Sequence, residues 1–423
     1  MNDSDQSQER RSLTHDTAWS ILATGTRTVG AVVVFFLLAR YLEERQYGLY
    51  AAALALFLLL GAFVTLGTSH IVVKRVSTDR SLAASSWGAA LLPGVLLAVA
   101  MSIFLAALGD IAVPRMGAEA ILLLALAEFL GIAISVPAAH ALQALDRFPQ
   151  SAVLTMLWTV LRVAFVVIAF FVLDETTLVG VGWALLAASV VAGAVSSLVL
   201  MSVVGRPRFS IVESRQICRE GLPFSLTQIS GIVLGDIDKQ MLVRRSNGDF
   251  LTGIYSAGNR VVGLAATPLY AVLAATYPRF FARGAEEGLR GTWAYAKRLM
   301  VPVCGYAAAA GAGLFIVAPL VDDILGDGYA DSISVIRWMS VIPLIHLPAL
   351  LAGEALTGAG FQNTRNKFII GAGALNVALN LALIGPYGID GVIVATYASE
   401  VLLLGGLVIW IRNHIVHVGV SNG

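Results

Sequence analysis

The sequence predicts an all-α polytopic membrane protein of about twelve transmembrane helices in two parallel-repeat six-helix bundles around a central cavity. Composition is the first observation that predicts it. Hydrophobic residues make up 57% of the 423 residues and charged residues only 13%, whereas soluble domains contain about 25% charged residues. The second is a series of long continuous apolar stretches, and the third is a set of motifs that recur in the second half of the chain.

The apolar stretches divide the chain into spans separated by short polar loops. The predicted spans are 17–39, 49–68, 87–108, 118–138, 151–173, 178–203, 223–244, 251–276, 299–318, 333–357, 367–386 and 388–411. A helix needs about 20 apolar residues to cross a bilayer, and a transmembrane β-barrel would instead show alternating segments of about ten. No loop is long enough for a nucleotide-binding domain, and the phosphate-loop motif Gly-x-x-x-x-Gly-Lys-Ser/Thr is absent from the sequence.

Loop charges predict the orientation. Lysine and arginine gather in the loops on the side of the N-terminus, whereas the loop 319–332 carries four aspartates and neither basic residue. Cytoplasmic loops are enriched in lysine and arginine, so both termini are expected in the cytoplasm of a multi-pass protein of the plasma (inner) membrane. The net charge of +1 gives no field for a nucleic-acid partner.

The two halves of the chain share short motifs in the same order. Tyr47–Ala52 is matched by Thr252–Ala257, Pro137-Ala138 by Pro348-Ala349, and Gly180-Val181 by Gly391-Val392. Both copies begin on the cytoplasmic side, so the repeats are parallel and suit alternating access around a central cavity. We therefore expect an N-terminal six-helix bundle at 1–204, a cytoplasmic linker at 205–222 and a C-terminal six-helix bundle at 223–423.

The last two spans carry a recognisable motif. It consists of Asn376 and Asn380, then Pro386-Tyr387-Gly388-Ile389-x-Gly391 and Ala395-Thr396. This motif resembles the multidrug/oligosaccharidyl-lipid/polysaccharide exporter superfamily, whose MATE-like fold has two bundles.

Two further stretches narrow the resemblance. Arg27, Ala39-Arg40 and Tyr47-Gly48-Leu49-Tyr50 open the first half, and the second half runs from Gly221-Leu222-Pro223 through Asp238-Lys239 to Gly253-Ile254-Tyr255. Both resemble the polysaccharide repeat-unit flippases. The resemblance implies a flippase that exports a polyprenyl-pyrophosphate-linked oligosaccharide, such as an O-antigen unit, from the cytoplasmic to the outer leaflet. Its partners would be that glycan, membrane lipids and other glycan-assembly proteins.

Four cations within the predicted spans are candidates for substrate binding: Arg27, Arg162, Lys239 and Arg260. A charge at the centre of a membrane helix costs about 2.5–3.5 kcal/mol, so such groups usually face a cavity. A lipid pyrophosphate is multiply negative, and arginine can bind phosphate oxygens through paired hydrogen bonds. The alternative is that each cation pairs with an acid and fastens helices together. Asp236 lies three residues before Lys239, a spacing that favours such a pair.

Four acids within the predicted spans are candidates for ion coupling: Glu128, Asp236, Asp238 and Glu400. A carboxylate in a low-dielectric site can carry a proton between states, and it can also hold Na⁺ or pair with an arginine. Coupling to H⁺ or Na⁺ is therefore one expectation, and structural ion pairs are the other.

Asn376 and Asn380 lie one turn apart on one helix face. Amides in membrane helices commonly hydrogen bond to a neighbouring helix, and the alternative is contact with sugar hydroxyls. The sequence shows no metal-ligand spacing and no nucleophile with a nearby base, so it predicts no cofactor, no metal and no enzyme activity.

Three alternative functions stay open at the level of sequence. The first is an ion-coupled multidrug or metabolite antiporter of the same fold, whose cavity would be apolar with negative sites for cationic drugs. The second is a membrane scaffold for glycan assembly. The third is an integral-membrane glycosyltransferase or polymerase, for which only the loop 319–332 offers acids.

Overall fold

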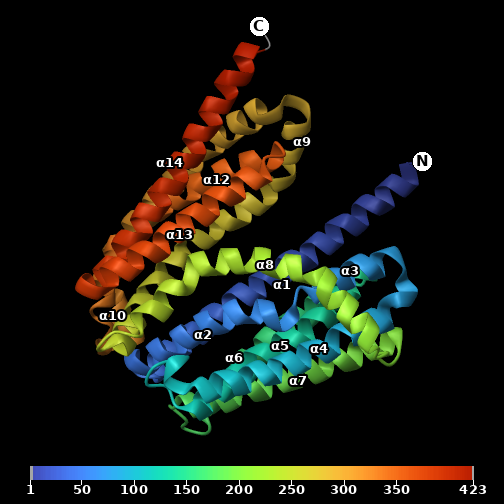
Figure 1. Ribbon diagram of the computed structural model, residues 1–423, viewed down its shortest axis with the longest axis vertical. Coiled ribbons are helices and arrows are strands. Elements are labelled where there is room, and N and C mark those ends of the chain that lie inside the picture. Colours follow the sequence, from blue (N-terminus) through green and yellow to red (C-terminus); the bar gives the residue numbers. More distant parts are fainter. Residues whose placement is uncertain (1–2, 422–423) are drawn as a thin grey trace. The chain divides into compact units, whose positions relative to one another are not determined.

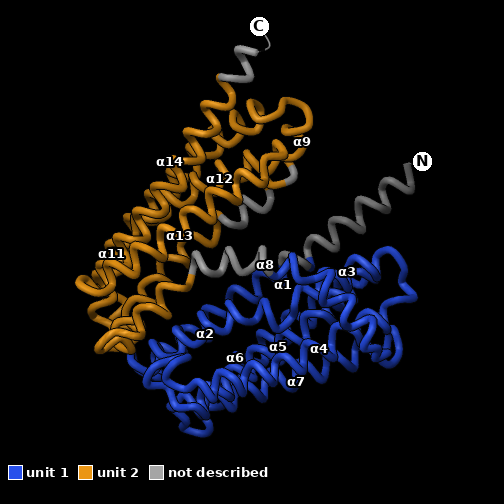
Figure 2. Tube along the Cα trace, in the orientation of Figure 1, with its two compact units in different colours: residues 1–232 blue, residues 233–423 orange. Residues whose placement is uncertain are grey.

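The chain is helical, and no strand occurs within residues 3–421 (Figure 1). The computed structural model describes the backbone of residues 3–421, and it describes the side chains of residues 19, 22–225, 236–269, 276–277 and 279–416. The chain divides into two compact units, Met1–Ile232 and Val233–Gly423, which we call unit 1 and unit 2 (Figure 2).

Unit 1 is built around a central helix, α5. Its elements are α1 (Asp3–Tyr41), α2 (Glu43–Thr65), α3 (Thr68–Thr78), η1 (Arg80–Leu82), α4 (Ala83–Leu108), η2 (Gly109–Ile111), α5 (Ala118–Ala144), α6 (Phe148–Phe171), α7 (Leu178–Val204) and the start of α8 (Ile211–Leu242). α5 contacts α3, α4, α6 and α7. Small residues make these contacts close, since a Cβ atom at Gly131 would lie 2.4 Å from Cζ2 of Trp158 on α6. Such small residues are typical where membrane helices pack backbone to backbone.

The segment after α7 is held against unit 1. The Arg208 backbone N–H donates to the Ala84 carbonyl at 3.1 Å, and the Arg75 guanidinium pairs with Glu220 at 3.0 Å. A Cβ atom at Gly221 would lie 2.2 Å from the Leu66 carbonyl oxygen, so only glycine fits this approach. The segment that the sequence predicts as the linker is therefore attached along its length to helices of unit 1.

Unit 2 contains a very long helix that bends sharply. Its elements are the end of α8, α9 (Gly248–Val317), α10 (Leu320–Leu325), η3 (Asp327–Tyr329), α11 (Ser332–Met339), α12 (Pro343–Gly358), α13 (Gln362–Tyr387) and α14 (Ile389–Ser421). Within α9, Gly288 has a φ of 60° and a ψ of −151°, a conformation that glycine adopts readily and other residues avoid. α9 is thus two helices joined at Gly288. A core that includes Phe280, Leu351 and Leu407 holds α9, α12 and α14 together.

Nine helices in the described part of the chain are long and apolar enough to cross a membrane, and a tenth span results if α11 and α12 are counted together. These two helices are bent by 45°, whereas the sequence predicts one continuous span at 333–357. Pro343 explains the break, because proline has no N–H donor and is favoured at the first position of a helix. The predicted spans 223–244 and 251–276 lie in part outside the described side chains. The prediction of an all-helical multi-pass membrane protein is confirmed.

Candidate functional site

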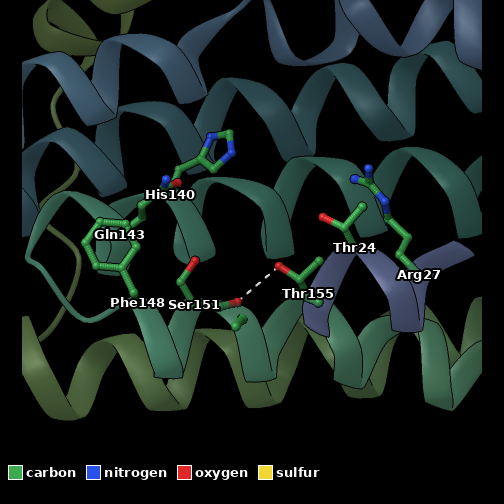
Figure 3. Close-up of a pocket in the computed structure, with 9 residues that line it drawn as sticks. Thr24, Arg27, His140, Gln143, Phe148, Ser151 and Thr155 are labelled. Carbon is green, nitrogen blue, oxygen red and sulfur yellow. Dashed lines mark hydrogen bonds between the residues drawn. The ribbon is translucent and has the colours of Figure 1, made fainter. Parts of the chain in front are cut away.

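Unit 1 contains a polar pocket between α1, α5 and α6 (Figure 3). Its volume is about 160 Å³. Its polar lining comes from Thr24 and Arg27 on α1, His140 and Gln143 on α5, and Ser151 and Thr155 on α6. The lining therefore offers a cation, an imidazole, an amide and three hydroxyls from three different helices.

Arg27 is the charged group of this pocket. Its side chain is exposed, and within the described side chains no acid forms an ion pair with it. Thr28, the next residue, instead bonds back to its own helix, from its hydroxyl to the Thr24 carbonyl at 3.0 Å. A cation inside a membrane span is expensive unless it meets water or an anion. Arg27 is therefore an exposed cation of this pocket without an ion-pair partner among the described side chains.

His140 is a second polar group of the pocket. Its Nδ1 atom is buried and makes no hydrogen bond to the described residues. The ring lies 6.2 Å from that of His70 on α3, and His70 stacks on Phe224 of α8 at 5.3 Å. Buried polar atoms normally have a partner, so a ligand or a water at the pocket is expected to bond to His140.

Arg162 lies in a different environment from Arg27. Its Nη1 atom donates to Glu128 Oε2 at 2.8 Å, which joins α6 to α5. The Arg162 guanidinium also bonds to the Tyr50 hydroxyl of α2 and lies 5.6 Å from the centre of the Trp158 ring. These contacts fix Arg162 and Glu128 to each other, an arrangement that favours a structural role for both.

Unit 2 contains a compact charged cluster at the end of α8. The Lys239 ammonium bonds to the Asp236 carboxylate and lies 4.0 Å from Asp238 Oδ1. The Tyr255 hydroxyl of α9 donates to the other oxygen of Asp238, and Tyr255 also bonds to the Thr396 hydroxyl of α14. Asp238, Lys239 and Tyr255 are buried, so three helices of unit 2 meet at these charges.

Arg260 lies near this cluster but outside its core. It is on α9, it is exposed, and it repels Lys239 electrostatically. Like Arg27, it forms no ion pair with any side chain that the structure describes. Of the four candidate cations, Arg162 and Lys239 are engaged by acids, whereas Arg27 and Arg260 form no ion pair among the described side chains.

Glu400 is paired with a histidine. Glu400 on α14 and His346 on α12 approach to 3.0 Å between Oε1 and Nδ1. The second carboxylate oxygen, Oε2, is buried and has no hydrogen-bond partner among the described groups. This pair joins two helices of unit 2.

Asn376 and Asn380 are buried between helices. Asn380 Nδ2 donates to Asn376 Oδ1 at 2.9 Å, and Asn376 Nδ2 donates to the Ser399 hydroxyl of α14 at 3.1 Å. The geometry favours the role of an amide link between α13 and α14 over direct contact with a sugar. In the described side chains, no group of three or more histidines, cysteines and acids is placed to hold a metal ion.

Comparison with known families connects the chain to glycan biosynthesis. The model of the family described as "Polysaccharide biosynthesis protein" matches residues 13–282. The chain belongs to this polysaccharide biosynthesis family. The match includes Arg27 and the pocket around it, the cluster at Lys239, and Arg260, and it ends before His346 and Glu400. No curated protein sequence matches the chain.

Solved structures show the fold of this polysaccharide biosynthesis protein. A multidrug resistance MATE family transporter of the MOP superfamily in an inward-facing conformation has a TM-score of 0.78 and 17% identity, covering 94% of this chain and 96% of that one. A multidrug resistance MATE family transporter in an outward-facing conformation gives a TM-score of 0.59, also at 17% identity, with 96% of each chain covered. A MOP superfamily transporter from Pyrococcus furiosus, whose binding pocket is described as having reverse polarity, gives 0.62 at 16% identity, over 96% of this chain and 95% of that one. The fold is therefore that of MOP superfamily transporters.

Sequence reasoning missed the histidines of this family member. His346 lies within the predicted span 333–357 and His140 lies two residues after the predicted span 118–138, and six histidines are scattered along the sequence, so their count carries no signal. A usable signal is the spacing of polar residues: His140 and Gln143 are three apart, and Ser151 and Thr155 are four apart. Each pair lies on one face of its helix, so two polar faces in apolar spans indicate a shared polar pocket.

Proposed function

We propose that this protein is a flippase that carries a polyprenyl-pyrophosphate-linked oligosaccharide from the cytoplasmic to the outer leaflet of the inner membrane by alternating access. The observation that carries the proposal is Arg27, a cation inside a span that is exposed at a polar pocket without an acid partner in the described chain. In a polysaccharide biosynthesis protein, a pyrophosphate joined to sugars is a ligand with the matching charge. The protein acts by transport and not by catalysis.

The chemistry of the pocket supports a ligand that is both anionic and hydroxylated. A guanidinium can form two parallel hydrogen bonds to phosphate oxygens. Gln143, Ser151 and Thr155 offer the amide and hydroxyl groups that bond to sugars. At about 160 Å³, the pocket accommodates the phosphate end of the ligand and not a whole oligosaccharide. Arg27 and Arg260 are the cations that we assign to the substrate.

The proposal also specifies how the chain crosses the membrane. Both termini lie in the cytoplasm, since the basic loops are on the side of the N-terminus. Two six-helix bundles, at 1–204 and 223–423 with a linker at 205–222, act as the repeats that alternate. The polyprenyl chain stays in the lipid while the headgroup crosses.

Glu400 is the acid that we assign to coupling, with H⁺ as the ion. Glu128 is held by Arg162, and Asp236 is held by Lys239, so each of these carboxylates already has a cationic partner. The partner of Glu400 is His346, and histidine titrates near neutral pH. Asp238 remains the alternative, as a carboxylate that binds Na⁺.

A test is native mass spectrometry of the detergent-purified protein from its own host. Wild type is compared with Arg27→Gln and with Arg412→Gln, a matched change of an exposed arginine outside the pocket. We expect a lipid-linked glycan bound to wild type and to the Arg412 variant, and its loss from the Arg27 variant. Equal retention in all three would refute the role of Arg27. Absence of lipid-linked glycan from all three, with binding of small organic cations, would instead support the second candidate.

The second candidate is an ion-coupled multidrug or metabolite antiporter. It is favoured by the fold, because the neighbour with the TM-score of 0.78 is a multidrug resistance transporter. A cavity for cationic drugs requires uncompensated acids, whereas Glu128 and Asp236 both carry cationic partners. The test is efflux of a cationic dye from cells, which should be lost in Glu400→Gln if the protein is an antiporter of this kind.

A further inference from the structure

A second cavity in unit 1 lies at the ends of three helices. It has a volume of about 340 Å³, roughly twice that of the Arg27 pocket. It is lined where η1 and α4 begin and where α5 and α7 end. The candidate spans Arg80–Ile111, Ala118–Ala144 and Leu178–Val204 begin or end at this same level. The cavity therefore lies at the ends of these candidate spans, which is where lipid headgroups meet a membrane helix.

The lining of this cavity is amphipathic. Its apolar part consists of Ala83, Ala84, Leu145, Val203 and Val204, and its polar part of Arg80, Ser81 and Arg147. A free inorganic anion would leave most of this apolar surface in contact with water. A molecule with an anionic head and an aliphatic body would cover both parts.

Two arginines supply positive charge at the rim. Arg80 pairs with Asp146, and both side chains are about two-thirds exposed (67% and 65%), so this bridge is weak and exchanges readily. Arg147 donates to the Gln150 amide oxygen at 3.3 Å and has no acid partner in the part of the chain that the structure describes.

The charged residues near the cavity do not neutralise the positive charge of Arg80 and Arg147. Asp79 is outside the lining, and its carboxylate accepts the Ser81 backbone N–H at 2.9 Å. Hydrogen bonds from the Ser81 side chain and backbone lower the pKa of Asp79, which keeps it ionised at the start of η1. On the other side, Arg206 and Arg208 follow Val204, and the Arg208 backbone is bonded to Ala84 of the lining. Beyond the lining and its Asp146 partner, these neighbouring residues are one acid, Asp79, and two cations, Arg206 and Arg208.

The start of α4 faces the same cavity. α4 begins at Ala83 directly after η1, the Ala83 backbone N–H donates to the Arg80 carbonyl, and Ala83 and Ala84 line the cavity. The partial positive charge at a helix N-terminus falls here at the start of η1, where the Asp79 carboxylate already accepts the Ser81 N–H. The positive charge available at the cavity therefore comes from the two arginines.

We propose that this cavity binds the headgroup of an anionic glycerophospholipid. The phosphodiester lies between Arg80 and Arg147, and the glycerol and the first methylenes of the acyl chains lie against Leu145, Val203 and Val204. Because Ala84 both lines the cavity and holds the Arg208 backbone, the bound lipid also stabilises the attachment of the segment after α7 to unit 1. The site is separate from the Arg27 pocket, and the inference does not depend on the proposed function.

The test is lipid retention by the delipidated full-length protein, measured by native mass spectrometry with phosphatidylglycerol, phosphatidylethanolamine or phosphatidylcholine. Wild type is compared with Arg147→Gln, with Arg147→Lys, with the double variant Arg80→Gln/Arg147→Gln and with Arg290→Gln. Arg290 is an exposed arginine of unit 2 and serves as the matched control. Both cavity arginines are exposed, so these variants are expected to fold, which their elution as a single species checks.

We expect wild type to retain phosphatidylglycerol in preference to the two zwitterionic lipids. Arg147→Gln should weaken retention about fivefold and the double variant about twenty-fivefold, while Arg147→Lys and Arg290→Gln should retain it. Equal retention of the three lipids by wild type, or unchanged retention by the double variant, would overturn the proposal. An excess of inorganic phosphate separates the two sources of the anion. Displacement of the lipid by phosphate would show a plain anion site and would also overturn it.

Discussion

Each unit has a tyrosine at the same position of the repeated segment, and the buried charge beside that tyrosine differs between the two units. Tyr50 and Tyr255 occupy matching positions of the repeated segments Tyr47–Ala52 and Thr252–Ala257. In unit 1 the tyrosine meets a cation, Arg162, whereas in unit 2 it meets a carboxylate, Asp238. A hydroxyl can accept from one and donate to the other. The duplicated scaffold has therefore kept the hydroxyl while the charge beside it has changed sign.

The way in which the charges pair differs as well. In unit 1, Arg162 and Glu128 come from different helices and neutralise each other. In unit 2, Lys239 pairs with Asp236 within one helix, and Asp238 is a second acid beside the same lysine. Unit 1 thus holds a closed pair, and unit 2 holds a cluster with more acid than base. The buried pair of unit 1 joins two helices, whereas the cluster of unit 2 leaves one carboxylate in excess over the lysine.

The largest expected effect comes from opening the closed pair of unit 1. Arg162→Met leaves the Glu128 carboxylate buried without its cation, which should lower the stability by about 3–5 kcal/mol. The double variant Arg162→Met/Glu128→Gln should recover most of that loss, because no buried charge remains. Thermal unfolding in detergent, followed by the loss of the monodisperse elution peak, measures both. If the single variant were as stable as wild type, Arg162 and Glu128 would not compensate each other's buried charge.

A smaller effect is expected at the two tyrosines, and it sharpens the comparison. Tyr255→Phe removes a donor to a buried carboxylate, which should cost about 1.5–3 kcal/mol. Tyr50→Phe should cost less, about 1 kcal/mol, since Arg162 keeps its bond to Glu128. The same unfolding measurement on the two variants tests this order. Equal losses, or a larger loss at Tyr50, would contradict the different roles of the tyrosines.

The smallest expected effect concerns the segment attached to unit 1. A hydrogen bond from Gln216 and the Arg75 guanidinium lower the pKa of Glu220 below its ordinary 4.5. The lowered pKa means that this stabilisation is present above pH 4.5 and is lost as the pH falls through the folded-state value. The side chain is 35% exposed, so its worth is only about 0.3 kcal/mol. Unfolding is measured between pH 6 and pH 3.5 for wild type and for Glu220→Gln. At pH 6 the wild type should be more stable than the variant by this small free energy, and the difference should vanish towards pH 3.5.

Local features of the fold and site were predictable where the signal lies within one helix. The spans follow from continuous apolar stretches, and the spacing of Asp236 and Lys239 already favours the pair that the structure contains. The break between α11 and α12 also has a local cause, Pro343, although the stretch 333–357 looks continuous by its apolar composition alone.

Contacts between helices were not predictable in the same way. Glu128 lies on α5 and Arg162 on α6, with a loop between them. Which side chains of the two helices meet depends on how the helices pack. The pairing of His346 with Glu400 depends on how α12 lies against α14, and neither sequence neighbourhood marks it. The exposure of Arg27 and the burial of Asn376 and Asn380 were not predictable for the same reason. The sequence shows which face of a helix is polar, but the tertiary structure decides what packs against that face.

The most direct test of the central claim is a transport measurement in liposomes. The purified protein is reconstituted with lipid-linked oligosaccharide extracted from its own host, and membrane-impermeant periodate reports which glycans become accessible from outside. We predict that wild type makes the protected inner-leaflet pool accessible and that Arg27→Gln does so about tenfold to a hundredfold more slowly, while Arg412→Gln matches wild type. A protected pool that stays protected with the wild-type protein, or an Arg27 variant as fast as wild type, would contradict the account.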